Sequence, residues 1–264
     1  MSKTFLGHDK ALLTVILQCE TPEVAIGRIR NALCLGAEAF GLQVESLKPE
    51  YHNPETLSKI IREMKDKPCY VTNYRLHHNE GLSDDELAEG LVMLAENGAT
   101  LCDVMGDMFC KHPQELTDDE DAIRKQMLLI DKLHGMGAEV LMSSHIFKYT
   151  PAERVLEMAL EQQGRGADIV KIVSGASSME QQIENLRITD LLKRELNVPF
   201  LFLSCGEATL HRRLGAKLGC CMSLCVYEHD ALSTSSQPLL QTMKTIRDYI
   251  DFYVRRCVAG IISI

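Results

Sequence analysis

A lysine inside an apolar, β-branched segment is the residue of this chain best suited to covalent chemistry. Lys171 lies in residues 168–173, of sequence DIVKIV, which otherwise has the composition of a buried strand. Removing an ammonium from water is costly, so buried lysines tend to become neutral nucleophiles that attack ketones and form Schiff bases. The alternative is a strand-end lysine whose ammonium reaches solvent or pairs with a carboxylate.

Eight apolar, strand-like segments recur along the chain and must position this lysine. They are residues 12–19, 39–45, 69–74, 101–105, 139–143, 168–173, 199–204 and 220–226. A helical stretch with its own start signal lies between each pair of successive segments, except the last pair. Proline follows a capping residue at 21–22 and 53–54, and capping boxes are expected at 83–86 and 117–120. The seventh helix is expected at about 209–217, and an eighth at about 237–254.

Strands that alternate with helices predict a parallel sheet, and eight such units predict a single-domain (β/α)₈ TIM barrel over residues 1–264. An open, doubly wound sheet is the alternative fold. Such a sheet typically carries a glycine-rich phosphate loop after its first strand, and residues 18–22 (QCETP) do not form one.

Barrel enzymes carry their active sites at the carboxyl ends of the strands, which selects further candidates. His145 follows the fifth strand, so its side chain is expected to share a cavity with Lys171 on the next strand. A histidine titrates near neutral pH and could move protons beside a Schiff base. Arg213 or Arg212, on the seventh helix, could bind a carboxylate bidentately. A histidine that only caps backbone groups, or a solvent-facing arginine, is the bland alternative.

Composition excludes several other functions. The net charge of −9 lacks the basic character of a nucleic-acid-binding protein. No apolar stretch is long enough to cross a membrane and no signal peptide is evident, so a cytoplasmic protein is expected. The ten cysteines form no Cys-x-x-Cys pair and are expected to act mainly as small core residues. No metal and no cofactor is expected.

Four segments in the second half of the chain resemble those of type I 3-dehydroquinate dehydratases, the Schiff-base enzymes of the shikimate pathway. The resemblance rests on residues 143–147 (SSHIF) with Thr150-Pro151, 166–172 (GADIVKI), 213–215 (RLG) and 231–237 (ALSTSSQ). It implies a carbon–oxygen lyase of aromatic amino acid biosynthesis that acts on a small carboxylated ketone. A homodimer is compatible with it.

The resemblance also implies individual roles. Lys171 would form the imine with the substrate ketone, and His145 would remove the adjacent proton and return one to the departing hydroxyl. Arg213 and Gln237 would hold the substrate carboxylate, and Ser233 would contact it from a closing loop.

The first half of the chain departs from the family pattern. The family's second strand carries a glutamate and an arginine that hold substrate hydroxyls, and here Gly41 and Gln43 occupy the matching positions. The family's third-strand arginine corresponds to Arg75, with Tyr74 as the alternative register. A glutamate that follows it in the family corresponds to Asn79 or Glu80, and the acidic pair of the fourth strand is not reproduced in residues 103–108.

Three functional hypotheses remain open at this point. The first is a dehydratase that acts on 3-dehydroquinate or on a related carboxylated cyclic ketone, because the residues that read substrate hydroxyls have changed. The second is a class I Schiff-base aldolase, which would share the barrel and the lysine. The third is a non-catalytic paralogue that binds a small carboxylate.

Overall fold

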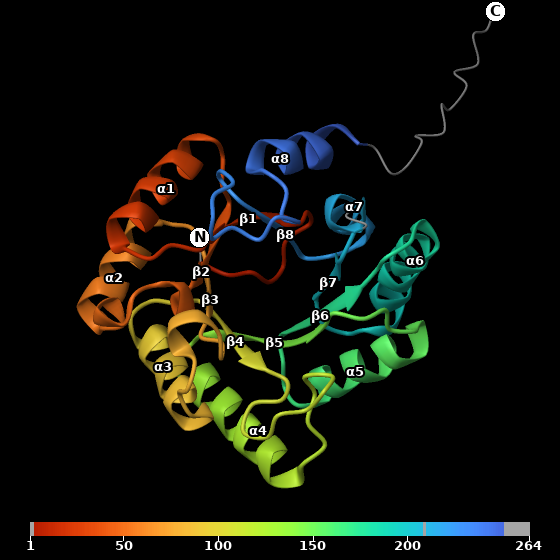
Figure 1. The fold of residues 1–264 in the computed structure, drawn as a ribbon, viewed down its shortest axis with the longest axis horizontal. Helices are drawn as coiled ribbons and strands as arrows, with labels where there is room; N and C mark the ends of the chain where they lie inside the picture. Colours follow the sequence, from red (N-terminus) through yellow and green to blue (C-terminus); the bar gives the residue numbers. More distant parts are fainter. Residues whose placement is uncertain (1–2, 208–209, 251–264) are drawn as a thin grey trace, which may run out of the picture.

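The computed structural model describes residues 3–207 and 210–250, in which parallel strands alternate with helices around a barrel (Figure 1). The strands are β1 (Leu12–Leu17), β2 (Ala39–Gln43), β3 (Cys69–Thr72), β4 (Leu101–Met105), β5 (Glu139–Ile146), β6 (Ile169–Gly175), β7 (Phe200–Cys205) and β8 (Met222–Cys225). The α-helices are α1 (Pro22–Cys34), α2 (Pro54–Glu63), α3 (Asp84–Glu96), α4 (Glu120–Gly135), α5 (Ala152–Gly164), α6 (Met179–Glu195), α7 (Leu210–Leu218) and α8 (Leu240–Tyr249). Short 3₁₀ helices are η1 (Val44–Ser46), η2 (Pro49–Tyr51) and η3 (His77–Asn79).

The strands follow one another around a nearly closed barrel in the order β7-β6-β5-β4-β3-β2-β1-β8. The strand β1 pairs in parallel with both β2 and β8. The two ends of this order, β7 and β8, are connected by a hydrogen bond of 2.9 Å that the amide of Cys221 donates to the carbonyl oxygen of Phe200. The predicted (β/α)₈ barrel is therefore confirmed, and the open doubly wound sheet is wrong. None of the helices in the described ranges is long and apolar enough to span a bilayer.

The helix boundaries differ from the sequence prediction where other contacts hold the chain. The capping box at Ser83 is confirmed, but α4 is capped by Asp119 rather than by Thr117. The amide of Thr117 instead donates to the carbonyl oxygen of Gly106, which keeps Thr117 bound to the end of β4. The helix α8 begins at Leu240, because residues 238–240 pair with Val226 in extended conformation, and it ends before residue 250. Residues 251–254 of the predicted helix lie outside the described residues.

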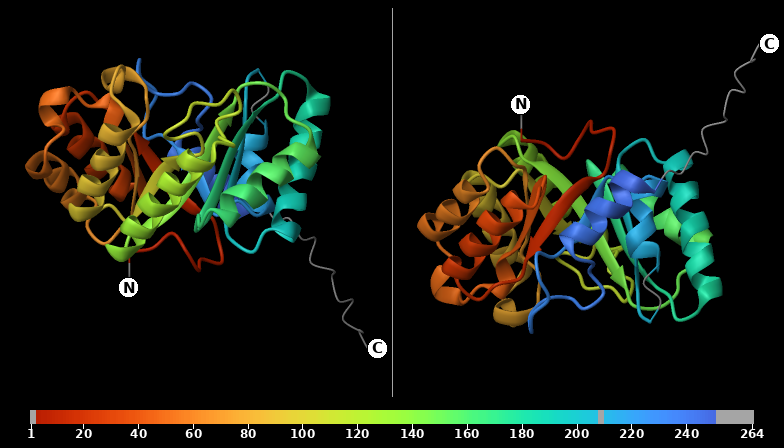
Figure 2. Two further views of the ribbon diagram at one scale, coloured as in Figure 1. Left: turned by 90° about the horizontal axis from the view of Figure 1, so that it is seen from below. Right: turned by 90° about the horizontal axis from the view of Figure 1, so that it is seen from above.

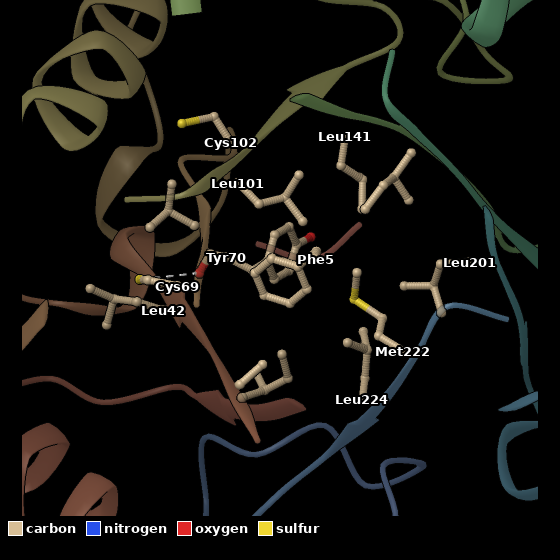
Figure 3. Close-up of a cluster of buried hydrophobic side chains, with 14 of the residues drawn as sticks. Phe5, Leu42, Cys69, Tyr70, Leu101, Cys102, Leu141, Leu201, Met222 and Leu224 are labelled. Atoms are coloured by element: carbon tan, nitrogen blue, oxygen red, sulfur yellow. Dashed lines mark hydrogen bonds between the residues drawn. The ribbon is translucent and has the colours of Figure 1, made fainter. Parts of the chain in front are cut away.

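The amino-terminal segment closes one end of the barrel. Phe5 is buried and its amide donates to the Glu139 carboxylate at 2.8 Å. Figure 3 shows Phe5 beside Tyr70, surrounded by apolar side chains such as Leu141 and Met222. The loops after β4 and β8 lie at the opposite end (Figure 2). A packed apolar layer therefore separates the end of the barrel that carries these loops from the end that the amino-terminal segment closes.

The cysteines only partly follow the expected core role. Those buried are Cys19, Cys69, Cys102, Cys220 and Cys225. Cys34 and Cys110 are exposed, and every cysteine in the described part of the chain is free.

A buried glutamate joins the ends of β2 and β3. Glu45, in η1, is 1% exposed, and the Thr72 hydroxyl lies 2.8 Å and 2.9 Å from its two carboxylate oxygens. Burial raises the pKa of Glu45 to about 7, although hydrogen bonds from Thr72 and from the Tyr74 amide oppose that rise. The negative charge of Asp103 raises the pKa further. Glu45 is thus a carboxyl that titrates near neutral pH.

We expect Glu45 to make the stability of the barrel depend on pH. Folding raises the pKa of Glu45 from 4.5 to about 7, so the folded state binds this proton more tightly than the unfolded state. The stabilisation is fully present below pH 4.5 and is lost as the pH rises to about 7. Glu45→Gln should remove a contribution of roughly 3 kcal/mol to this pH dependence.

Urea denaturation at several pH values between about 4.5 and 8 measures this contribution. The free energy of unfolding of Glu45→Gln should increase relative to that of the wild type as the pH rises. The variant Glu50→Gln, at an exposed position, is the control and should keep the wild-type slope. A Glu45→Gln slope equal to that of the wild type would contradict the prediction.

Candidate active site

A cavity of about 620 Å³ opens at the carboxyl ends of the strands. The lining includes five residues predicted from the sequence, namely Lys171, His145, Gln43, Arg75 and Gln237. Two predicted residues, Arg213 and Ser233, are not part of the lining, whereas Arg212 is. A second cavity, of about 680 Å³ and lined by Phe5 and Arg247, holds none of the predicted residues.

Lys171 is both buried in its strand and paired with a carboxylate. The lysine is 4% exposed, and its Nζ donates to Oδ2 of Asp103 at 3.1 Å. The same Nζ donates to the hydroxyls of Tyr70 at 2.9 Å and Tyr74 at 2.7 Å. Both hydroxyls donate in turn to Asp103, and the Ser143 hydroxyl donates to its other oxygen at 2.5 Å. The buried ammonium and carboxylate are thus held in a fully hydrogen-bonded cluster.

The position of Tyr70 explains the glycine on the second strand. Gly41 is the register partner of Tyr70 on β3 and of Ile16 on β1. A Cβ atom at Gly41 would lie 2.9 Å from Cδ1 of Tyr70 and would collide with Cδ1 of Ile16. The tyrosine ring therefore uses the space that a side chain at residue 41 would need, and no charged group fits there.

His145 is held by a glutamate from the loop after β4. Oε2 of Glu115 lies 2.8 Å from Nδ1 of His145 and accepts a hydrogen bond of 2.7 Å from its backbone amide. Burial raises the pKa of Glu115, but the hydrogen bonds and charge of His145 outweigh this effect and lower it. An ionised carboxylate only accepts hydrogen bonds, so we assign the hydrogen to Nδ1, and Nε2 is the basic atom of the neutral ring.

The conformation of Glu115 is itself supported by neighbouring groups. Its φ of 47° lies in the left-handed region, which is unfavourable for a residue with a side chain. The Ser144 hydroxyl donates to its carbonyl oxygen at 2.6 Å and accepts a hydrogen bond from Gln162 at 2.9 Å. The side chain of Gln162 also bonds the backbone of Lys171. One buried glutamine therefore ties the backbone of the lysine to the loop that holds the histidine.

Sequence reasoning missed Glu115, and it placed the family glutamate that follows the third-strand arginine at residue 79 or 80. Asn79 is buried and donates to Oδ1 of Asn73 at 2.8 Å and to the carbonyl oxygen of Tyr74 at 3.0 Å. Glu80 is exposed. Glu115 lies 30 residues before His145, in a stretch with no local pattern, so no sequence signal pointed to it.

In the segment that follows β3, Tyr74 is the residue whose side chain reaches Lys171. Arg75 is directed sideways, where its guanidinium binds both oxygens of Asp84 at 2.6 Å and Oδ1 of Asp107 at 2.8 Å. Burial lowers the pKa of Arg75, but the hydrogen bonds and charges of the two aspartates raise it above its usual value. Arg75 still borders the cavity, with its charge already balanced by protein carboxylates.

Arg212 presents a cation to the cavity that is not balanced in this way. Its Nε donates to the carbonyl oxygen of Ser204 at 2.7 Å, and burial lowers the pKa of its guanidinium. No carboxylate of the described residues forms an ion pair with it. Gln237 also lines the cavity and is 6% exposed, and its side-chain NH2 group is a donor that an anion could accept from. Arg212 and Gln237 together could hold an anionic group.

The loop after β8 is fastened across the cavity edge. Gln18 bonds Thr234 twice, accepting from its amide at 3.0 Å and donating to its hydroxyl at 3.3 Å. The Ser233 hydroxyl bonds the backbone of Asp230, accepting from its amide at 2.8 Å and donating to its carbonyl oxygen at 3.0 Å. In this conformation Thr234 and Ser236, rather than Ser233, line the cavity.

Comparisons with known proteins agree with this barrel. A protein-family model described as type I 3-dehydroquinase matches residues 13–253. The 3-dehydroquinate dehydratase of Alkaliphilus oremlandii is 33% identical over 106 residues, which is 39% of this chain and 40% of that protein. The enzyme of the same name from Methanosarcina barkeri is 28% identical over 218 residues, covering 79% of this chain and 81% of that protein.

The solved structures give the same fold. The crystal structure of 3-dehydroquinate dehydratase from Geobacillus kaustophilus superimposes with a TM-score of 0.79 at 15% identity, covering 94% of each chain. The match of the family model over nearly the whole described barrel decides the assignment, and the chain belongs to the type I 3-dehydroquinase family.

Proposed function

We propose that this protein is a Schiff-base-forming lyase that dehydrates 3-dehydroquinate or a related carboxylated cyclic ketone. The observation that carries the proposal is the joint presence of Lys171 and His145 in the lining of one cavity. Tyr74 connects these two residues. Its hydroxyl donates to Asp103, the carboxylate that is paired with Lys171, and its ring centroid lies 5.3 Å from that of the His145 imidazole. Family membership and the names of the relatives support the same reaction.

Imine formation would begin with loss of a proton from Lys171 and attack of its amine on the substrate ketone. Loss of water from the adduct yields a protonated imine, which carries the same positive charge as the original ammonium. Asp103 lies 3.1 Å from Nζ and therefore stabilises both charged forms. The protonated imine draws electrons from the neighbouring carbon and makes its C–H bond acidic.

His145 would supply the acid–base chemistry of the elimination. With hydrogen on Nδ1, held by Glu115, the Nε2 atom takes the proton from the carbon beside the imine and an enamine forms. The enamine expels the β-hydroxyl group, which leaves as water with the proton that His145 returns. Hydrolysis of the conjugated imine then releases the enone and restores Lys171.

Carboxylate recognition is better supported for Arg212 than for the predicted Arg213. Arg212 and Gln237 both line the cavity, and the guanidinium and the side-chain NH2 group are donors suited to a carboxylate. The roles that the resemblance implies for Arg213 and Ser233 stay predictions, as do a homodimer and a cytoplasmic location. A closing movement of the loop after β8 would be needed to bring Ser233 to the substrate.

The side of the cavity that reads hydroxyl groups favours the broader substrate class. Tyr70 occupies the space beside Gly41, and Arg75 is paired with Asp84 and Asp107. Gln43 and Glu45 remain as polar groups in this part of the lining. Because buried polar partners decide discrimination between hydroxylated substrates, a changed set predicts a changed preference. A class I aldolase would use the same lysine, and only product analysis separates the two reactions.

The first prediction about the mechanism tests the lysine imine. Incubation with 3-dehydroquinate should produce enone absorbance, and borohydride should trap a reduced adduct on Lys171 that mass spectrometry locates. Lys171→Met should abolish both signals. Because this change leaves Asp103 buried without its counter-ion, the double variant Lys171→Met/Asp103→Asn is the better folded negative control.

Each outcome of this experiment separates the hypotheses. An adduct on Lys171 without turnover would assign the imine chemistry to another ketone. Cleavage of a carbon–carbon bond in the product would support the aldolase. Adduct formation that persists in Lys171→Met would remove the lysine from the mechanism, and a wild type that shows neither adduct nor turnover would favour the non-catalytic paralogue.

A second prediction distinguishes the two adjacent arginines. Arg212→Ala should raise KM about 100-fold, because it removes a charge-assisted, bidentate contact to the substrate carboxylate. Arg213→Ala is the matched control and should change KM less than ten-fold. Steady-state kinetics of enone formation measures both KM values. A larger increase in KM for Arg213→Ala than for Arg212→Ala would assign carboxylate binding to Arg213.

A third prediction concerns the group that holds the histidine. Glu115→Gln keeps an acceptor for Nδ1 but removes the charge that stabilises the protonated imidazole, so kcat should fall on the order of ten-fold or more. Imine trapping on Lys171 should persist, because the lysine does not contact this carboxylate. Glu80→Gln, at an exposed residue, is the control and should retain wild-type kcat. Equal kcat values for both variants would refute the role of Glu115.

A further inference from the structure

We propose that Tyr74 is a catalytic residue that relays protons between Lys171 and Asp103 while the imine forms. The inference rests on the proposed Schiff-base function and adds a group to it that the sequence had considered only as an alternative to a substrate-binding arginine. Tyr74 touches the reacting nitrogen directly, since its hydroxyl oxygen accepts a hydrogen bond of 2.7 Å from Nζ of Lys171.

Tyr74 and Tyr70 make the same polar contacts but occupy different places. Each hydroxyl accepts from Lys171 and donates to Asp103. Tyr74 lines the cavity and its ring meets the His145 ring edge-on at 5.3 Å. Tyr70 is not part of the lining and lies beside Phe5 in the apolar layer (Figure 3). Of these two phenols, Tyr74 is therefore the one that shares the lining of the cavity with Lys171.

The lysine needs such a relay because an ammonium has no lone pair with which to attack. Asp103 is the carboxylate in contact with Nζ, but it is 1% exposed and does not line the cavity. When Nζ turns toward a ketone in the cavity, its bond to Asp103 must lengthen. Tyr74 lines the cavity and its hydroxyl is already hydrogen-bonded to both groups, so it can keep them connected.

The proton transfers balance over the whole step. Nζ gives a proton to the Tyr74 oxygen as the phenol proton passes to Asp103, and a neutral amine and a neutral carboxylic acid result. The amine bonds to the carbonyl carbon, and one N–H proton moves to the former carbonyl oxygen. Asp103 then returns its proton through Tyr74 to this hydroxyl group, which departs as water. The products are a protonated imine, water and the original Asp103 carboxylate.

The phenol is suited to this role because it stays protonated. Burial, together with the negative charge of Asp103, raises the pKa of Tyr74 well above its usual value. A protonated hydroxyl can accept one proton while it releases another, whereas a phenolate would instead trap the lysine as an ion pair.

The experiment compares Tyr74→Phe with Tyr70→Phe, using 2,4-pentanedione as the probe. This diketone carries no carboxylate or hydroxyl group and forms an enaminone with reactive lysines, so its reaction reports imine formation without substrate recognition. Tyr74→Phe should slow enaminone formation about 100-fold, the lower range for general acid–base catalysis. Tyr70→Phe should slow it less than ten-fold. Mass spectrometry confirms that the product lies on Lys171.

Three results would overturn the proposal. The first is equal slowing in both variants, which would indicate a shared electrostatic effect. The second is a Tyr74→Phe variant that reacts as fast as the wild type, and the third is a wild type that does not react with the diketone. Turnover of 3-dehydroquinate is measured separately, so an enzyme that turns over but shows equal variants would disprove the relay and leave the proposed function intact.

A measurement on the wild type covers the case in which Tyr74→Phe fails to fold, which circular dichroism would reveal. The rate of enaminone formation is followed in mixtures of H₂O and D₂O. Two protons moving together through the phenol should give a curved dependence of the rate on the deuterium fraction. A rate that is independent of deuterium, or that falls linearly as for a single proton, would overturn the relay.

Discussion

The buried pair of Lys171 and Asp103 is the constraint on which the rest of the site depends. Two charges removed from water are tolerated only when their remaining hydrogen-bonding capacity is satisfied. Here the carboxylate accepts bonds from the lysine, from two tyrosines and from Ser143. These donors come from β3, β5, β6 and the segment that follows β3, so the curved sheet must hold its register for the pair to remain satisfied. Loss of one partner of such a pair costs roughly 3–5 kcal/mol.

This constraint also accounts for the altered second strand. A tyrosine at residue 70 completes the shell around Asp103, and its ring together with the Ile16 side chain leaves no room for a side chain at residue 41. The glycine therefore belongs to the same arrangement as the tyrosine and is not an isolated loss. The cluster of hydrogen bonds around Asp103 stabilises the lysine. The lining of the cavity still includes Gln43 and Glu45, two polar groups that could recognise a ligand.

The fold could be predicted from the sequence because each strand and helix carries a local signal. The alternation of apolar segments with capped helices is repeated, and repetition corrects errors such as the late start of α4. Lys171 and His145 could be found because they lie on consecutive strands, His145 near the carboxyl end of β5 and Lys171 within the apolar segment of β6. Glu115 could not, since its role depends on a left-handed loop that brings it back to His145 from a distant segment.

The choice between adjacent residues stayed open in the sequence for a related reason. Side chains at neighbouring positions point in different directions, so the pairs Tyr74 and Arg75, and Arg212 and Arg213, can be resolved only by the exact register of the backbone. Arg75 is directed toward Asp84 and Asp107, which lie in other segments of the chain.

The same charge pair offers a physical reason why a rebuilt site can keep the chemistry of its family. Imine formation converts an ammonium into a protonated imine and leaves the positive charge at the same nitrogen. In the proposed mechanism, Asp103 and its hydrogen-bond donors would therefore need little net rearrangement between the free enzyme and the protonated imine, which is the preorganisation that favours catalysis. Recognition of the substrate depends on other residues at the cavity edge, so those positions can change while the lysine cluster remains constant. A barrel with this separation can move to a new ketone without losing its reactive amine.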